Sequence, residues 1–238
     1  MCKSVLGDNI LLINTPAIVL KSFSYGESSL IAKCFSKSSG KVSLIIKGAK
    51  RTKSSKAVYF QPLNYLDIIY NNKINRELQV LSKVNFRHYW SRILEDLYKL
   101  SLTIAILELT DKTQSDNDPN PSLFLVLKEV LNAYNNTKID PKVLFWFYEC
   151  ALLNNLGFQP SLEDPDLPGL VLPEIKNDTQ CIIILSTLLN GEINQLQDLR
   201  VSKKTGQLIS NYLWNLLDYH FEELSKVKSF GVVKKLLS

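Results

Sequence analysis

Cysteine and histidine are scarce in this chain. Four cysteines and two histidines occur among 238 residues, and His88 and His220 lie too far apart in the sequence to suggest a catalytic pair. The cysteines show none of the short spacings of a disulfide framework or a clustered zinc site, and their scatter is typical of a reducing compartment. We therefore expect no disulfide, no structural zinc and no bound cofactor. The four cysteines are Cys2, Cys34, Cys150 and Cys181.

Long apolar runs are also missing. The longest, such as residues 181–185, are far too short to cross a bilayer. Near the start of the chain, Asp8 and Asn9 interrupt the apolar segment that a signal peptide needs. Together with the cysteine pattern, these features predict a cytoplasmic protein that has no membrane contact.

The motifs that mark common enzymes are absent as well. Residues 38–41 (SSGK) resemble the end of a phosphate-binding P-loop, but that motif needs a glycine where Phe35 stands and a serine or threonine where Val42 stands. No G-x-G-x-x-G, G-x-S-x-G or H-E-x-x-H occurs. We therefore expect no catalytic centre and no reaction coupled to nucleotide hydrolysis.

The distribution of charge, in contrast, is distinctive. Residues 1–90 contain 14 Lys or Arg and 4 Asp or Glu, a net charge of +10. Residues 91–238 contain 14 and 19, a net charge of −5. A basic part joined to an acidic part indicates that the first part binds a polyanion.

The positive charge is concentrated in residues 40–62, GKVSLIIKGAKRTKSSKAVYFQP. A β-type segment ends at Gly48, and the chain then carries lysine and arginine with no acid and with small residues between them. Such a spacing predicts a flexible loop in which little is buried. A cationic loop that leaves a strand can bind a phosphate backbone, although most charge runs are solvated surface loops.

Aromatic residues near this loop could stack on bases if they point outward, although each is individually more typical of a core or a barrel wall. These residues are Tyr25, Tyr59, Phe60 and Tyr65. The candidate nucleic-acid-binding residues are Lys41, Lys47, Lys50, Arg51, Lys53, Lys56 and Tyr59.

The first part of the chain predicts a small β-barrel. Five short β-type segments, separated by turn residues, follow one another, which is typical of a small barrel or sandwich. Five strands with a long charged loop fit an OB-type barrel best, over residues 15–88 and preceded by an extension over residues 1–14. The predicted strands are residues 17–23, 29–35, 41–47, 63–70 and 76–84.

From residue 89 onward the apolar residues follow helical spacing, which predicts an all-α domain over residues 89–238. The fold class is therefore α+β, an N-terminal five-stranded OB-type barrel followed by a helical C-terminal domain. One helix covers Ile93 to Leu107, and the next two begin at Pro121 and after Asp140. An irregular proline-rich excursion occupies residues 160–177. Further helices are expected over residues 181–189 and from Ser202 to Leu224, before a basic tail over residues 226–237.

An ordered set of segments over roughly residues 15–237 resembles the RecO family of bacterial recombinational repair proteins. The order and spacing of the segments carry the resemblance. The segments are AIVL (17–20) with YGES (25–28), GKV (40–42), KGAK (47–50), FQP (60–62), ECALL (149–153) with LGFQP (156–160), and KSF (228–230) before residues 232–237.

The resemblance implies a non-enzymatic DNA repair and recombination mediator associated with the nucleoid. It implies binding of single- and double-stranded DNA, annealing of complementary strands, and partnership with RecR. It also implies that RecA is helped onto DNA coated by single-strand-binding protein, through contact with that protein's acidic C-terminal tail.

Two departures from the family pattern affect these expectations. Many members carry a cysteine-rich zinc site after the glycine at position 157, whereas this chain has no cysteine in residues 163–166. Residues 145–148 (FWFY) replace the basic residues usual on that helix, so the pocket for the acidic tail must differ or be more apolar. The alternatives to a recombination mediator are a general nucleic-acid-binding module, RNA-directed binding included, and an enzyme or scaffolding protein.

Overall fold

The computed structural model describes residues 11–51, 54–73, 76–160, 162, 167–221, 224 and 233. The chain forms two compact units. The barrel unit consists of Met1–Tyr89 together with Gln114–Pro121, and the helical unit consists of Trp90–Thr113 and Ser122–Ser238. A single boundary after residue 88 therefore does not describe the whole division, because the connector between two helices returns to the barrel unit.

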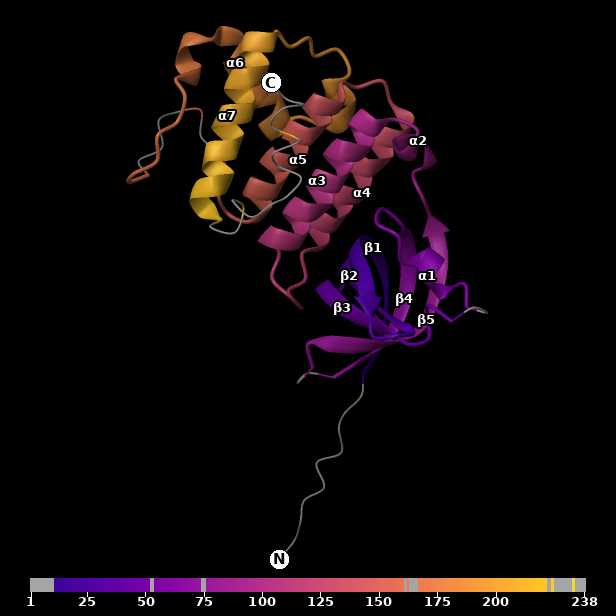
Figure 1. The fold of residues 1–238 in the computed structure, drawn as a ribbon. Coiled ribbons are helices and arrows are strands. Elements are labelled where there is room, and N and C mark those ends of the chain that lie inside the picture. Colours follow the sequence, from indigo (N-terminus) through magenta and orange to yellow (C-terminus); the bar gives the residue numbers. More distant parts are fainter. Residues whose placement is uncertain are drawn as a thin grey trace, which may run out of the picture. The chain divides into compact units, whose positions relative to one another are not determined.

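Five strands close into a barrel in the barrel unit, which confirms the predicted fold class (Figure 1). Their order around the barrel is β1-β2-β3-β5-β4, and the β3–β5 pair is parallel while the other pairs are antiparallel. The strands are β1 (Leu11–Tyr25), β2 (Ser29–Ser36), β3 (Gly40–Ile46), β4 (Tyr65–Asn72) and β5 (Leu78–His88).

Strand β1 is longer than predicted from the sequence because it pairs with two neighbouring strands. Its first half pairs with β4, starting at Leu11 opposite Asn72, and its second half pairs with β2 as far as Tyr25 opposite Ser29. A register shift after Val19 increases the local bend and lets one strand turn from one neighbour to the other. Residues 11–14, predicted as part of an extension, therefore belong to the barrel.

The barrel interior is filled by alternate residues of the strands, as the two-residue repeat of a strand requires. Ala17, Val19, Leu44 and Ile68 are fully or almost fully buried. Phe60, which follows a short helix, is also fully buried in this core. Burial of such a side chain contributes about 1.5–3 kcal/mol, so the segment between β3 and β4 is anchored at this residue.

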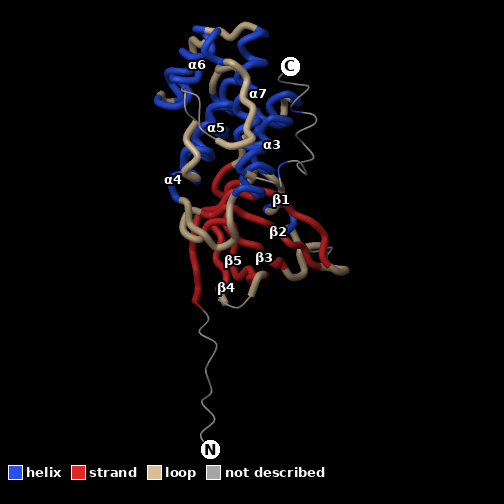
Figure 2. Tube along the Cα trace, turned by 90° about the vertical axis from the view of Figure 1, so that its left-hand side faces the viewer, coloured by secondary structure: helices blue, strands red, loops and turns tan. Residues whose placement is uncertain are grey.

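The helical unit is built around α5 (Pro141–Asn155), which contacts α3 (Leu97–Thr113), α6 (Thr179–Asn190) and α7 (Lys203–His220). Figure 2 shows that the strands gather in the barrel unit and the long helices in the helical unit. No helix in the described part of the chain is both long and apolar enough to cross a membrane. The remaining elements of this unit are α2 (Ser91–Leu94), α4 (Pro121–Asn136), and the 3-10 helices η1 (Ile175–Asn177) and η2 (Ile193–Leu196).

Side-chain caps set several of these helix ends as predicted. Asp140 accepts a hydrogen bond from the amide of Lys142 at 2.9 Å at the start of α5, and Ser202 accepts one from the amide of Thr205 at 3.1 Å at the start of α7. Beyond α5, Gly157 adopts the left-handed conformation with φ +84°, which ends the helix.

Two predicted helices were wrong in extent. The segment from Ile93 to Leu107 is two helices, α2 and α3, because the Asp96 carboxylate accepts hydrogen bonds from the amides of Tyr98 and Lys99 and starts a new helix. Helix α7 ends at His220, where Phe221 turns to an extended conformation, so Leu224 does not lie on it.

Candidate nucleic-acid interface

The basic loop after β3 is a braced turn. Gly48 has φ +68°, and the amide of Arg51 donates to its carbonyl at 3.2 Å. The amide of Lys50 donates to the carbonyl of Ser28 at 3.0 Å, which ties the loop to the β1–β2 turn, and Ala49 is buried. The prediction that little in this run is buried was therefore wrong at residue 49. The side chains of Lys47, Lys50 and Arg51 remain exposed on a backbone that is held in place.

The loop leads into a short helix, α1 (Lys56–Tyr59), that sequence patterning did not predict. Lys56 is exposed, and Tyr59 lies half-buried against the barrel core. Residues three apart on a helix lie on the same side, so this cation and this ring are neighbours. The side-chain amide of Asn64 donates to the carbonyls of Val58 at 3.0 Å and Tyr59 at 2.9 Å, which holds the end of α1.

Lys41 differs from the other candidate cations. Its side chain is only 10% exposed, and its ammonium lies 3.4 Å from a carboxylate oxygen of Asp116 on the α3–α4 connector. The amide of Asn117 also donates to the Lys41 carbonyl at 2.9 Å. Lys41 is thus engaged by the connector within the barrel unit. Lys53, a further candidate, lies outside the described residues.

The aromatic candidates also occupy different environments. Tyr25 is half exposed, whereas Phe60 is part of the core. The Arg87 guanidinium lies over the Tyr65 ring, 5.3 Å from its centre, and donates to the Tyr65 hydroxyl at 2.9 Å. It also donates to the Asp67 carboxylate at 2.7 Å. These two hydrogen bonds, first that to Asp67, raise the pKa of Arg87 above its ordinary value.

Two exposed aromatic residues at the end of β5 were missed by sequence analysis. The ring centre of Phe86 lies 6.3 Å from that of Tyr59 and 5.8 Å from that of Tyr89. The predicted strand stopped at residue 84, so this pair fell between a strand and a helix. The signal that could have found it is the run VNFRHYW (84–90), in which aromatic residues lie on both sides of Arg87.

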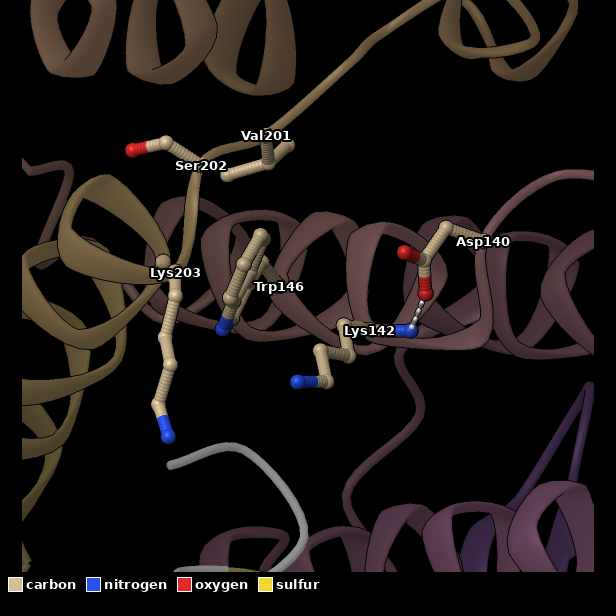
Figure 3. A pocket seen from close by; sticks show the side chains of 7 residues that line it. Asp140, Lys142, Trp146, Val201, Ser202 and Lys203 are labelled. Carbon is tan, nitrogen blue, oxygen red and sulfur yellow. Dashed lines mark hydrogen bonds between the residues drawn. The ribbon is translucent and has the colours of Figure 1, made fainter.

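The helical unit contains a cavity of about 330 Å³ between α5 and the start of α7. Figure 3 shows the indole of Trp146 standing between the side chains of Lys142 and Lys203. The indole nitrogen of Trp146 donates to Ser210 at 3.1 Å, which fixes the ring. The cavity is therefore lined by two ammonium groups and the Asp140 carboxylate, around an indole that is itself almost fully buried. It is lined by Asp140, Lys142, Trp146, Val201, Ser202, Lys203 and Gly206.

The described residues contain no group of three or more His, Cys, Asp or Glu placed to hold a metal ion. Residues 163–166, the segment on which the expectation of no zinc site partly rests, lie outside the described part. His220 stacks on Phe158 with ring centres 4.0 Å apart, and burial lowers its pKa below the ordinary value. This histidine packs as an aromatic ring against its neighbour.

These features define a protein that joins a five-stranded OB-type barrel, with an exposed cationic loop, to a helical domain. Two family models match the chain, described as Recombination protein O N terminal over residues 11–90 and Recombination protein O C terminal over residues 94–165. The chain belongs to the RecO family.

Curated relatives carry the same family name. The chain is 31% identical to the "DNA repair protein RecO" of Salinibacter ruber over a match that covers 64% of this chain and 58% of that protein. It is 29% identical to the protein of that name from Alkaliphilus metalliredigens, with 95% of this chain and 100% of that protein covered. For the Flavobacterium johnsoniae protein of that name the identity is 26%, and the shares are 95% and 99%.

Proposed function

We propose that this protein is a non-enzymatic recombination mediator in DNA repair that binds single- and double-stranded DNA and anneals complementary strands. Its relatives are named DNA repair proteins. The observation that carries the proposal is the braced loop after β3. Lys47, Lys50 and Arg51 are exposed on it, Lys56 is exposed at the start of the helix that follows, and the described loop contains no acidic residue.

The braced loop suits a phosphate backbone better than a freely moving one would. Hydrogen bonds at Lys50 and Arg51 already hold the backbone, so less conformational entropy is lost when the side chains engage phosphates. Lysine and arginine neutralise phosphates without reading sequence, so binding is general. Lys41 contributes to the local potential, while its ammonium is engaged by Asp116.

Annealing follows from the same electrostatics. Two single strands repel each other through their phosphates, and a surface with a charge of +10 over residues 1–90 lowers this repulsion. Duplex formation needs no external energy source, so no nucleotide is required. Residues 91–238, with a charge of −5, are repelled by DNA and remain available to protein partners.

The cavity beside Trp146 is the proposed site for the acidic C-terminal tail of single-strand-binding protein. In an otherwise acidic part of the chain it concentrates Lys142 and Lys203 next to an apolar ring. Ammonium groups attract an acidic peptide, and the half-buried Val201 in the lining offers an apolar contact to that peptide. Through this contact the protein helps to load RecA onto coated DNA, and RecR is the further proposed partner.

Annealing of labelled complementary strands tests the proposal. With the full chain, annealing of bare strands is expected to be faster than the spontaneous reaction, equal with and without ATP, and slower as salt rises. Strands coated with single-strand-binding protein are expected to anneal as well. No acceleration on bare strands would overturn the proposal. If RNA displaces the DNA as well as DNA itself does, a general nucleic-acid-binding module is favoured instead.

A further inference from the structure

Three aromatic rings form a row at one end of the barrel unit, between α1 and the end of β5. The Phe86 ring contacts Tyr59 edge-on and lies tilted against Tyr89. Phe86 is 45% exposed and Tyr89 is 52% exposed. Large apolar rings gathered in an exposed cluster are uncommon on a soluble surface unless they bind something.

The strand pairing explains why the row is open to solvent. Pairing between β3 and β5 covers only three residue pairs and ends at Ile45 opposite Val80. Beyond Val80, β5 has a strand partner in the described residues only on its β4 side, where Phe86 lies opposite the core residue Leu66. The Phe86 side chain therefore leaves the core-facing side of the sheet. It does so at the end of the barrel, where Tyr59 of α1 covers only part of its ring.

A cation lies at one end of this row. Lys56 lies on the same side of α1 as Tyr59 and is exposed, whereas Lys83 leaves the opposite face of β5 from Phe86. Asp67 accepts a hydrogen bond from Arg87 and offsets part of its charge, which leaves Lys56 as the cation at the row. Aromatic rings beside a cation suit a ligand that carries both flat apolar groups and negative charges.

We propose that Tyr59, Phe86 and Tyr89 are a stacking platform for the bases of single-stranded DNA, and that this platform makes the protein prefer single strands to duplex. The inference rests on the proposed DNA binding and adds to it the part of the surface that distinguishes the two substrates. Unpaired bases stack on aromatic side chains, whereas paired bases are already stacked within the duplex. Phosphate contacts of the basic loop serve both substrates alike.

The test compares two double variants of the full chain. Phe86→Leu/Tyr89→Leu keeps apolar bulk but removes both rings, and Phe86→Tyr/Tyr89→Phe keeps both rings as a matched control. Affinity is measured for a single strand and for a duplex of equal length at one salt concentration. The leucine variant is expected to bind the single strand roughly 30-fold more weakly, from two lost stacking contacts. Its duplex affinity and the salt dependence of its binding should stay unchanged, and the aromatic control should behave as the wild type.

Each other result overturns the inference. Equal losses for single strand and duplex would make the rings structural or part of a general surface, and an unchanged single-strand affinity would remove them from the site. A loss in the aromatic control as large as in the leucine variant would exclude stacking. In these three cases wild-type DNA binding persists and the proposed function survives. A wild-type protein that binds neither DNA would instead overturn both.

Discussion

Lys41 of β3 and Asp116 of the α3–α4 connector are paired, through a parallel β-bridge and through side chains whose charged atoms lie 3.4 Å apart. The amide of Asn117 adds a hydrogen bond to the Lys41 carbonyl at 2.9 Å. A lysine from the most basic stretch of the chain thus holds the segment that connects, in sequence, two helices of the helical unit. The barrel unit is therefore incomplete in a fragment that ends near residue 88.

The close fit of Gly40 against the α3–α4 connector predicts that this position does not tolerate a larger residue. Gly40 has φ +64°, and a Cβ there would overlap the carbonyl oxygen of Asp118. Gly40→Ala is expected to lower the free energy of unfolding by roughly 2–5 kcal/mol, from the left-handed backbone and the overlap together. Gly26→Ala is the matched control, because Gly26 has φ +58° but nothing within 4 Å of the added Cβ.

Denaturant unfolding of both glycine variants measures the difference. The control should lose only the left-handed cost of roughly 1–2 kcal/mol. Equal losses in the two variants would show that the connector does not press on Gly40.

Removal of loop charge should change the salt dependence of DNA binding. If about five phosphates are neutralised, log affinity for single strands falls with log salt at a slope of roughly −3.5. Replacement of Lys47, Lys50 and Arg51 by alanine is expected to flatten this slope by roughly 2 and to weaken binding to all sequences alike. Titration of a labelled single strand at several salt concentrations measures both, and an unchanged slope would remove these side chains from the interface.

Lys41→Met tests whether the paired lysine contributes less to the salt dependence of DNA binding than its exposed neighbours do. The ammonium of Lys41 is engaged by Asp116, so its loss should alter the salt slope by clearly less than the roughly 0.7 expected of one phosphate contact. The same titration measures this slope. A change equal to that of one full contact would instead place Lys41 on the DNA.

Glu149 predicts an unusual dependence of stability on pH. It is 2% exposed on α5, its Oε2 has no hydrogen-bond partner among the described residues, and burial raises its pKa well above the ordinary 4.5. Between the unfolded and folded pKa values the folded protein holds a proton that the unfolded chain has lost. The contribution of Glu149 to stability therefore falls as pH rises through this window, by about 1.4 kcal/mol per pH unit.

Glu149→Gln removes this titration while keeping the shape of the side chain. Chemical unfolding of both proteins between about pH 5 and about pH 7 should show the variant gaining stability relative to the wild type as pH rises. A difference between the two that does not change with pH would contradict a carboxyl group that is protonated when folded.

The cavity beside Trp146 predicts binding of an acidic peptide. Lys142→Glu/Lys203→Glu reverses both charges that line it and is expected to weaken the peptide by at least about tenfold, which is about 1.4 kcal/mol. Lys128→Glu/Lys138→Glu, at two positions outside the cavity lining, is the charge-matched control. Fluorescence anisotropy of a labelled peptide that ends in a free carboxylate measures the affinity, and equal weakening by both variants would indicate attraction to overall charge.

Several features of the protein could be predicted from the sequence because near neighbours decide them. The side chains of Asp140 and Ser202 accept hydrogen bonds from amides two or three residues away, so the starts of their helices can be predicted from a short sequence segment. Alternation of apolar residues likewise marked the five strands, and the uneven count of charges marked the basic part. The helix break at Asp96 is local too, but the apolar stripe that continues across it concealed the cap.

The sequence by itself therefore determined the strands, most of the helices and the basic loop of a RecO protein. Tertiary structure alone decided which side chains share a surface. It engaged Lys41 with Asp116, placed Phe86 against Tyr59, and brought Lys203 to the helix that carries Lys142. These partners are distant in the chain, so no periodicity or spacing connects them. Their contacts depend on how strands close and helices pack, which the whole core sets through burial of apolar surface.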